Sequence, residues 1–262
     1  MRPVVALLTD FGVRDHYAGT MKGVILGICP DVTLVDLSHD LPPHDVLAGA
    51  LELGASYRYF PAGTIFLVVV DPGVGSARRG IAADVGDYRF VAPDNGVLTL
   101  ALADHPPKRA VELSERRYAR PTVSRTFEGR DRFAPAAAWL AKGIDLGALG
   151  RSAGPLMRLE LPKAAVEGGT IRGEVLRVDR FGNLVTNIDR RIFDASAGQA
   201  LEIRVGGHQV SKVVSTYADA AAGEICALFG STDQLEIAAN GASAAARLDL
   251  GRGAPVHIVR RA

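Results

Sequence analysis

Residues 64–80 read TIFLVVVDPGVGSARRG, and this stretch decides the fold. An apolar run ends at Asp71, and a Pro-Gly turn and two arginines, Arg78 and Arg79, follow it. A strand without polar residues is typical of a parallel sheet that helices cover on both faces. Such α/β sheets bind ligands beyond the carboxyl ends of their strands. The stretch therefore predicts a buried strand that delivers a carboxylate to a ligand-binding edge, unless Asp71 is an ordinary turn residue.

The rest of the first half alternates between strand and helix patterns. Strands are expected at residues 4–10, 32–38 and 64–71, helices at 16–29, 44–60 and 132–143, and a hairpin-like pair of strands within 79–94. This alternation predicts an α/β N-terminal domain, residues 1–158, with a mainly parallel central sheet.

The second half has a different pattern, in which short β-branched segments are separated by Gly, Asp and Asn turns. Its expected strands lie at residues 170–179, 183–189, 200–207, 208–217, 224–230, 234–240 and 254–261. Such spacing is typical of a small barrel or sandwich. The sequence thus predicts a linker at residues 159–168 and a smaller all-β C-terminal domain at residues 169–262.

The composition excludes several classes of protein. Lys plus Arg and Asp plus Glu nearly balance, with a net charge of +1, which gives no support for a nucleic-acid or anionic-membrane partner. No apolar run reaches the roughly 20 residues of a membrane span. The two cysteines, Cys29 and Cys226, are far apart and have apolar neighbours, which indicates reduced core residues. The N-terminus enters a strand pattern without a signal-peptide cleavage region, so a cytoplasmic protein is expected.

Familiar catalytic motifs are absent. The segment GVGSARRG does not match the G-x-G-x-x-G of dinucleotide-binding proteins, and no phosphate-binding G-x-x-x-x-G-K-[ST] loop occurs. There is also no G-x-S-x-G, no H-E-x-x-H and no Cys/His spacing of a metal site. The sequence argues against a zinc enzyme and against a nucleoside triphosphatase.

Polar residues follow several expected strands, and each has a structural and a functional interpretation. Asp10 either caps the following helix or grips a vicinal diol, because its two oxygens can accept from two hydroxyl groups. Glu128 lies in the charged segment SRTFEGRDRFAP, residues 124–135, which is either a solvated loop or part of a site. Asp179 and Asn183 flank a turn at Gly182 and are either turn residues or ligand contacts. Spacing alone leaves these alternatives open.

Taken together, segments from both halves resemble one family. They are LLTDFG, VDLSHDLPPHDV, VVVDPGVGS, APDNGVLT, TFEGRDRFAP, DRFGNLVTN and GSTDQLEIAANGASA. In this order they resemble the S-adenosyl-L-methionine (SAM) hydrolases, or SAM hydroxide adenosyltransferases, which are hydrolytic relatives of the fluorinase and chlorinase enzymes.

The resemblance implies hydrolysis of SAM to adenosine and L-methionine, by attack of water on the 5′ carbon of the ribose. It also implies a homotrimer with active sites between the N-terminal domain of one subunit and the C-terminal domain of the next. No metal and no organic cofactor are implied, because SAM is the substrate. A sulfonium is already a good leaving group, so the expected task of the protein is to position and partly deprotonate the water.

The resemblance also implies roles for individual residues. The family handles water with an Asp, an Arg seven residues later and a His; Asp71 and Arg78 match the first two, and Glu128 stands where the family has the histidine of TFHGRD. The residues that match substrate-binding positions are Asp10, Asp15, Asp179, Asn183 and Ser231.

The replacement of the histidine by Glu128 keeps a second interpretation open. The chain is either a SAM hydrolase or a SAM- or adenosine-binding protein in which turnover is weak or lost. Halogenation, the activity of the fluorinase relatives, is disfavoured because a negative Asp71 would repel a halide.

Overall fold

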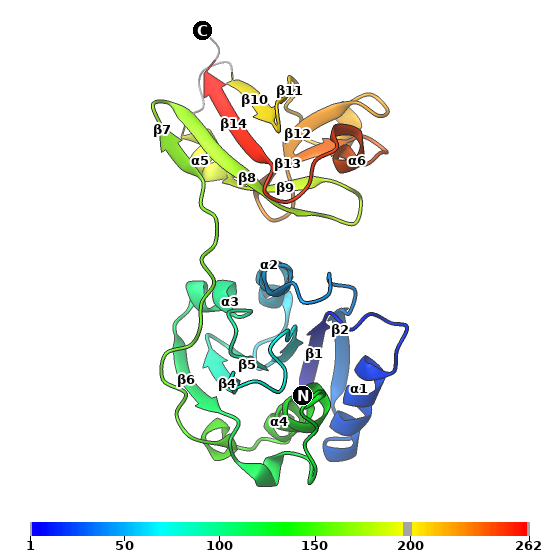
Figure 1. The fold of residues 1–262 in the computed structure, drawn as a ribbon, viewed down its shortest axis with the longest axis vertical. Helices are drawn as coiled ribbons and strands as arrows, with labels where there is room; N and C mark the ends of the chain where they lie inside the picture. The colour runs from blue at the N-terminus through cyan, green and yellow to red at the C-terminus, as the bar shows by residue number, and fades with distance from the viewer. Residues whose placement is uncertain (1, 196–200, 261–262) are drawn as a thin grey trace. The chain divides into compact units, whose positions relative to one another are not determined.

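The computed structural model of the chain describes residues 2–195 and 201–260. The chain forms two compact units, residues 1–159 and 160–262, and each has its own sheet and its own hydrophobic core (Figure 1). Residues 200 and 261, at the ends of two expected strands, lie outside the described residues.

The N-terminal unit is built on a six-stranded sheet with the order β2-β1-β3-β5-β4-β6. The strands are β1 (Val4–Thr9), β2 (Thr33–Ser38), β3 (Ile65–Val69), β4 (Gly80–Val85), β5 (Tyr88–Pro93) and β6 (Pro107–Glu112). Strands β2, β1, β3 and β5 pair in parallel, whereas β4 pairs antiparallel with both β5 and β6. The mainly parallel sheet and the hairpin within residues 79–94 are thereby confirmed.

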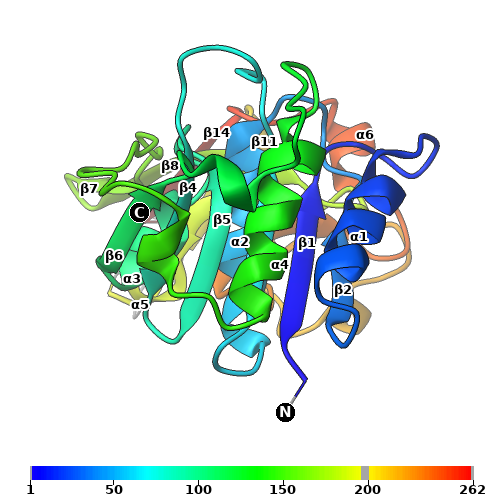
Figure 2. The same cartoon turned by 90° about the horizontal axis from the view of Figure 1, so that it is seen from below.

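Helices cover both faces of this sheet, as the apolar strands predicted (Figure 2). They are α1 (Tyr17–Ile28) and α4 (Ala134–Ala141) on one face, and α2 (Val46–Ser56) and α3 (Thr99–Asp104) on the other. Successive residues of β1 point to opposite faces, so that Leu7 packs with α1 while Leu8 packs with α2. Both faces of each central strand must therefore be apolar.

The C-terminal unit is an antiparallel sheet with the order β11-β10-β14-β8-β9-β13-β12, to which β7 adds beside β8. The strands are β7 (Ala165–Glu167), β8 (Thr170–Val178), β9 (Leu184–Asp189), β10 (Leu201–Val205), β11 (His208–Val210), β12 (Ile225–Phe229), β13 (Gln234–Ala239) and β14 (Pro255–Arg260). Ala227 of β12 bonds to the backbone of Lys212 and Val214, just after β11. This contact joins the two ends of the sheet and gives it the expected barrel-like form.

Some expectations about local elements differ from the structure. The strand expected at residues 208–217 ends at Val210, because the backbone of Lys212 and Val214 bonds to Ala227 of β12 in place of β10. A capping box of Thr216 and Asp219 then begins a short 3₁₀ helix, η5 (Tyr217–Asp219). Strand β7 lies within the segment expected to be a linker. The short helices α3, α5 (Arg190–Asp194) and α6 (Ala244–Leu248) carry too few turns to show a helical period in the sequence.

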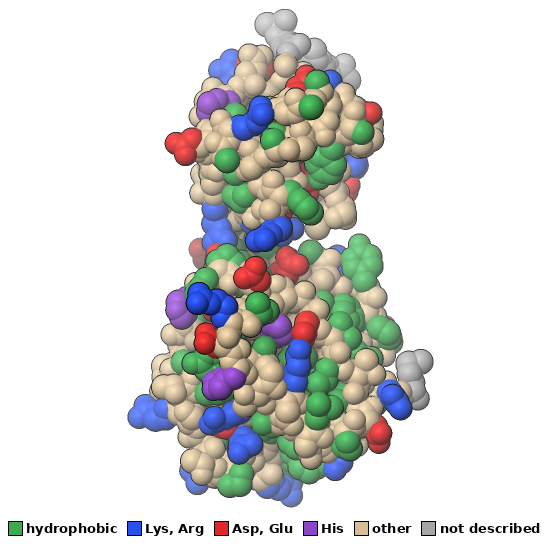
Figure 3. Space-filling model, turned by 90° about the vertical axis from the view of Figure 1, so that its right-hand side faces the viewer, with side chains coloured by type: hydrophobic (Ala, Val, Ile, Leu, Met, Phe, Trp, Pro, Cys, Tyr) green, Lys and Arg blue, Asp and Glu red, His purple; other side chains and the backbone are tan. Residues whose placement is uncertain are grey.

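The charge distribution on the surface and the character of the helices agree with what the composition predicted. On the face of the molecule in Figure 3, side chains of Lys and Arg, of Asp and Glu, and hydrophobic side chains are interspersed. Among the described residues, no helix has the length and apolar character that crossing a bilayer requires.

Candidate active site

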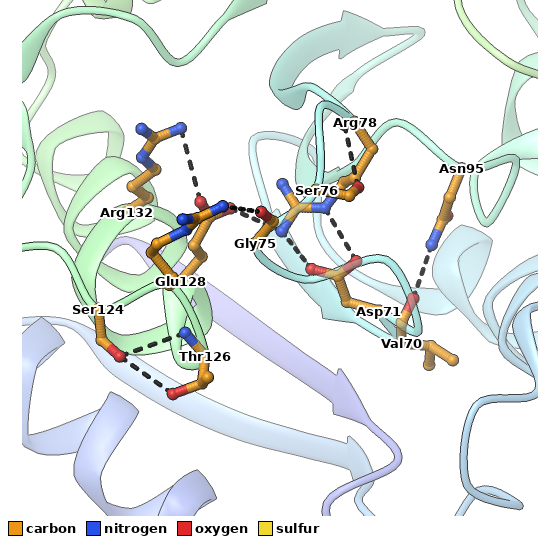
Figure 4. Close-up of polar contacts among 11 residues, drawn as sticks. Val70, Asp71, Gly75, Ser76, Arg78, Asn95, Ser124, Thr126, Glu128 and Arg132 are labelled. Carbon is orange, nitrogen blue, oxygen red and sulfur yellow. Dashed lines mark hydrogen bonds and ion pairs between the residues drawn. The ribbon is translucent and has the colours of Figure 1, made fainter.

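Arg78 joins two carboxylates that come from separate loops (Figure 4). Asp71 follows β3, Arg78 precedes β4, and Glu128 precedes a π-helical turn, η3 (Gly129–Phe133). Arg78 Nε donates to Asp71 Oδ1 at 2.9 Å, and Arg78 Nη2 donates to Asp71 Oδ2. The same Nη2 lies 2.6 Å from Glu128 Oε2. The structure thus brings together the three residues to which the sequence assigned the handling of water.

The three charged side chains are almost completely buried. Asp71 is 5% exposed, and Arg78 and Glu128 are each 10% exposed. Burial by itself lowers the pKa of Arg78, but the contacts with Asp71 and then Glu128 outweigh it and raise that pKa. The guanidinium also lies 5.2 Å from the ring centroid of Phe133. Arg78 is therefore a permanent positive charge between two carboxylates.

Glu128 has acceptor capacity that its protein neighbours do not use. Its Oε1 is 3.8 Å from Arg132 Nη1, beyond hydrogen-bond distance. Its Oε2 is buried and, within the part of the chain that the structure describes, accepts no hydrogen bond of good geometry despite the close ion pair with Arg78. Asp71, in contrast, accepts from Arg78 with both oxygens. Glu128 is therefore the carboxylate better placed to accept a proton.

The loop between Asp71 and Arg78 has its shape because of Gly75. This residue has a φ of +76°, and a Cβ there would lie 2.4 Å from the carbonyl oxygen of Arg125. Arg125 Nη2 donates to the carbonyl oxygen of Gly75 at 3.1 Å. Asn95 Nδ2 donates to the carbonyl oxygen of Val70 at 2.8 Å and fixes the residue before Asp71. These contacts dock the loop on the segment that carries Glu128.

The two adjacent arginines have different partners. Arg78 points to Asp71 and Glu128, whereas Arg79 Nε donates to Asp94 Oδ2 at 2.9 Å and Arg79 Nη2 donates to the carbonyl oxygen of Pro155 at 2.8 Å. Asp94 is buried and its Oδ1 accepts from Met157 N at 2.8 Å. Arg79 therefore joins loops of the N-terminal unit, and Arg78 alone belongs to the carboxylate cluster.

The segment that carries Glu128 is anchored by Asp131, whose side chain is fully buried. Arg130 donates to its two oxygens at 2.7 Å each, and Ser124 N donates to Oδ2 at 2.8 Å. Burial raises the pKa of Asp131, but these bonds outweigh it, so the pKa lies below the usual range. Asp131 thus holds the loop before Glu128 against the π-helical turn after it, a kind of turn that is frequent at functional sites.

A cavity of about 150 Å³ opens beside the cluster. It is lined by Phe11, Tyr17, Val69, Asp71, Val74, Thr126, Phe127, Glu128 and Gly129. The ring centroid of Phe127 lies 6.0 Å from that of Phe11 and 5.1 Å from that of Tyr17, and the rings form an apolar wall. Phe127 lies both in the core and on this wall. The sequence could have indicated this aromatic wall, because Phe11 directly follows Asp10 and Phe127 directly precedes Glu128.

Asp10 and Asp15 lie on the loop between β1 and α1. Asp10 is not the cap of α1, because the N-cap is His16 and has no side-chain bond. Instead Asp10 Oδ2 accepts from His44 N at 2.7 Å and holds His44 at a φ of +67°. Asp15 is exposed and, within the described residues, makes no hydrogen bond or ion pair. A role for either residue in binding stays a prediction.

The other three predicted binding residues, Asp179, Asn183 and Ser231, line one cavity of about 960 Å³ in the C-terminal unit. Asp179 Oδ1 accepts from Phe181 N at 2.9 Å and Asn183 N at 2.8 Å, and Asp179 Oδ2 accepts from Asn183 Nδ2 at 2.9 Å. Asp179 is thus a turn residue, and the turn it forms presents the buried Asn183 to the cavity. Its own contact with a ligand stays a prediction.

The same cavity contains a polar pair, a buried glutamate and an exposed tyrosine, that the sequence did not indicate. Tyr217 Oη donates to Glu236 Oε2 at 3.0 Å, and Glu236 is only 6% exposed. Burial raises the pKa of Glu236, and burial together with Glu236 raises the pKa of Tyr217 to about 12. Glu236 alternates with apolar residues in QLEIAAN, so the strand pattern gave no reason to expect a buried carboxyl.

Among the described residues, no group of three or more His, Cys, Asp or Glu side chains could hold a metal ion. Asp71 and Glu128, the acidic residues of the cavity of about 150 Å³, both form ion pairs with Arg78.

Comparisons with known proteins assign the chain to a family. Models of the N-terminal and C-terminal domains of SAM hydroxide adenosyltransferases match residues 5–150 and 173–257. (R)-S-adenosyl-L-methionine hydrolases of Thermus thermophilus and Salinispora tropica are 42% and 40% identical to this chain, over 99% and 96% of it and 100% and 95% of their own lengths. A fluorinase of an Actinoplanes species is 31% identical over 98% of each chain. An uncharacterized conserved protein from Thermotoga maritima, known from its crystal structure, matches with a TM-score of 0.92 and 35% identity, over 98% of this chain and 100% of that one. The chain belongs to the SAM hydroxide adenosyltransferase family.

Proposed function

We propose that the protein hydrolyses SAM to adenosine and L-methionine. The observation that carries this proposal is the buried cluster of Asp71, Arg78 and Glu128 at the wall of a small aromatic-lined cavity. The cluster lies beyond the carboxyl end of β3, where α/β sheets bind their ligands. Relatives named SAM hydrolases, 40% and 42% identical over nearly the whole chain, support the same activity.

The reaction places few demands on acid catalysis. The oxygen of a water molecule forms a bond to the 5′ carbon, and the bond from that carbon to the sulfonium sulfur breaks. Its electron pair stays on sulfur, which becomes the neutral thioether of methionine, while a water proton passes to a carboxylate. Because the leaving group is already positively charged, the protein has to hold the water in line and accept its proton.

We assign these tasks within the cluster. Glu128 is the proton acceptor, supported by its Oε1, which is 3.8 Å from Arg132 Nη1 and so beyond hydrogen-bond distance, while Oε2 is in the close ion pair with Arg78. Asp71 holds Arg78 through two hydrogen bonds, and Arg78 in turn holds Glu128 beside the cavity through an ion pair. General-base help of this kind is worth roughly 10²- to 10⁴-fold in rate. No metal or organic cofactor takes part in this scheme, so treatment with EDTA should leave the rate unchanged.

The two carboxylates also bear on the choice of nucleophile. A halide that entered the cavity would meet Asp71 and Glu128, which are the charged residues of its lining, whereas Arg78 and Arg132 are not part of that lining. Neutral water does not experience this repulsion. The cluster therefore favours hydrolysis over halogenation.

The predicted binding residues are divided between the two units of the chain. Asp10 and Asp15 belong to the N-terminal unit, and Asp179, Asn183 and Ser231 belong to the C-terminal unit. We propose a homotrimer in which each active site uses the two units from neighbouring subunits, as the family resemblance implies. On dilution, activity should then fall together with the trimer in light scattering; an active monomer would contradict this assembly.

We further place the reaction in the cytoplasm. Cys29 and Cys226 are both buried and unpaired, which suits a reducing compartment. Fractionation of cells that produce the protein, followed by assay of each fraction, tests this location.

Chromatography of the products tests the activity. Purified protein incubated with SAM should release adenosine and methionine in equal amounts, and added chloride should give no 5′-chlorinated nucleoside. If SAM or adenosine binds in calorimetry while no adenosine is released, the chain is a binding protein that has lost turnover, and the proposal is wrong.

A further inference from the structure

A second cavity of the N-terminal unit, of about 830 Å³, is strongly basic. The charged residues of its lining are Arg78, Arg116, Arg117, Arg120, Arg125, Arg132, Glu115 and Glu128. Ser76, Ser114, Thr122 and Ser124 add hydroxyl groups. The whole chain has a net charge of only +1, so six arginines against two glutamates are a local concentration of positive charge.

Half of these arginines are already neutralised by carboxylates. Arg78 and Arg132 face Glu128, and Arg120 Nε lies 3.3 Å from Asp131 Oδ1. These ion pairs account for Arg78, Arg120 and Arg132 without any ligand.

The other three arginines have no such partner. Arg116, Arg117 and Arg125 form no ion pair with a carboxylate in the described ranges, 2–195 and 201–260. Arg125 donates to the carbonyl oxygen of Gly75, and Arg117 lies over the ring of Tyr118. Like charges around a concave wall repel one another and raise the local concentration of anions.

We propose that this cavity binds a multivalent oxyanion of the phosphate class, either inorganic phosphate or a small phosphorylated metabolite. Guanidinium groups match the oxygens of phosphate in pairs, and they remain charged at every physiological pH. Glu115 of the same lining offsets one of these three arginines, and a single carboxylate would compensate only one of the two charges that remain. Nothing in the hydrolysis of SAM requires this site, although Glu128 lines both cavities and, with Arg78, places this one next to the proposed catalytic cluster.

Tryptophan fluorescence can report the binding of an anion at this site. Its single tryptophan, Trp139, has its ring centroid 5.6 Å from that of Tyr118, and Arg117 lies 4.8 Å from the centroid of the Tyr118 ring. An anion that draws Arg117 into the cavity changes the surroundings of Tyr118 and hence the emission of Trp139.

The experiment is a titration of the full-length protein with inorganic phosphate, at constant ionic strength maintained with sodium chloride, followed by tryptophan fluorescence and by calorimetry. Wild type should show saturable binding. Arg116→Gln should weaken the affinity at least tenfold without touching the contacts of Tyr118 and Trp139. Arg191→Gln is the control, because Arg191 is 90% exposed in the C-terminal unit and should leave the affinity unchanged.

Three results would overturn the proposal. They are no saturable binding of phosphate to wild type by either method, an unchanged affinity in Arg116→Gln, and saturable binding of L-methionine at this site in place of phosphate. The last result would make the cavity a place for the carboxylate of the substrate. Pyrophosphate in a parallel titration separates the two sources of the oxyanion, because a larger affinity for pyrophosphate favours a phosphorylated metabolite and a smaller one favours the free ion.

Discussion

Arg78 Nη2 lies 2.6 Å from Glu128 Oε2 while the same guanidinium holds Asp71 through two hydrogen bonds. Two carboxylates that are distant in the sequence thus share one buried cation at the wall of a small cavity. Where the family motif has a histidine, this chain has a carboxylate that can equally accept a proton, and the arginine balances part of its charge.

Replacing Glu128 by glutamine should reduce kcat for SAM hydrolysis by at least about 10²-fold, because an amide cannot accept a proton from water. Adenosine affinity should change by no more than a few-fold, since the side chain keeps its shape. The matched control is Glu115→Gln, an exposed glutamate in the same unit, which should retain full activity. Equal kcat in Glu128→Gln and wild type would remove Glu128 from the mechanism.

Substitutions of two glycines can distinguish an effect on the shape of the loop between Asp71 and Arg78 from the general energetic cost of a positive φ. Gly75 and Gly63 have φ angles of +76° and +85°, but a Cβ at Gly75 meets the carbonyl oxygen of Arg125 at 2.4 Å, whereas one at Gly63 meets no atom within 4 Å. Both Gly→Ala variants should lose about 1–2 kcal/mol of stability from the backbone. Only Gly75→Ala should also lose most of its activity, by moving Asp71 and Arg78 away from Glu128. Steady-state kinetics at a temperature where both variants are folded decides this, and equal activities would contradict it.

Asp131→Asn should destabilise the protein at neutral pH by about 1–3 kcal/mol, because a buried charged acceptor loses hydrogen bonds from Arg130 and Ser124. The pKa of Asp131 is depressed in the folded state, so its contribution is present above the unfolded pKa of about 4 and is lost as the pH falls through the folded pKa. Urea unfolding at several pH values should therefore show a difference between wild type and variant that shrinks below about pH 4. A difference that stays constant down to low pH would show that Asp131 is not ionised in the fold.

Glu236→Gln should change the stability in the direction opposite to Asp131→Asn. Burial raises the pKa of Glu236, so the protonated form favours folding. That contribution is fully present below the unfolded pKa of about 4.3 and is lost as the pH rises through the folded value. The amide can still accept from Tyr217, and the variant should therefore gain stability relative to wild type between acidic and neutral pH. The same urea titrations measure this gain, and a difference independent of pH would refute the prediction.

Features that depend on the preferences of neighbouring residues could be predicted from the sequence. The strand that ends at Asp71 was predictable because each face of a buried parallel strand must be apolar, so the first polar residue marks its end. The turn at Asp179 was visible for a similar reason, since Asp, Gly and Asn have backbone preferences of their own.

Contacts between distant segments were not accessible from the residue pattern. Nothing local distinguishes Arg78 from Arg79, although one faces the carboxylate cluster and the other faces Asp94. The contact of Arg78 with Glu128 depends on how Gly75 docks against Arg125, and only the resemblance to a family suggested it. Glu236 is buried and accepts a hydrogen bond from Tyr217 of η5, a contact between separate elements that the alternation within one strand does not reveal.

The most direct test of the proposed hydrolysis is the fate of the oxygen. The protein is incubated with SAM in water enriched in ¹⁸O, and the adenosine formed is analysed by mass spectrometry. Attack of water on the 5′ carbon predicts one ¹⁸O atom in the 5′-hydroxyl group of adenosine, with unlabelled methionine released in equal amount. Release of adenosine without the label, or no adenosine at all from protein that binds SAM, would contradict the mechanism.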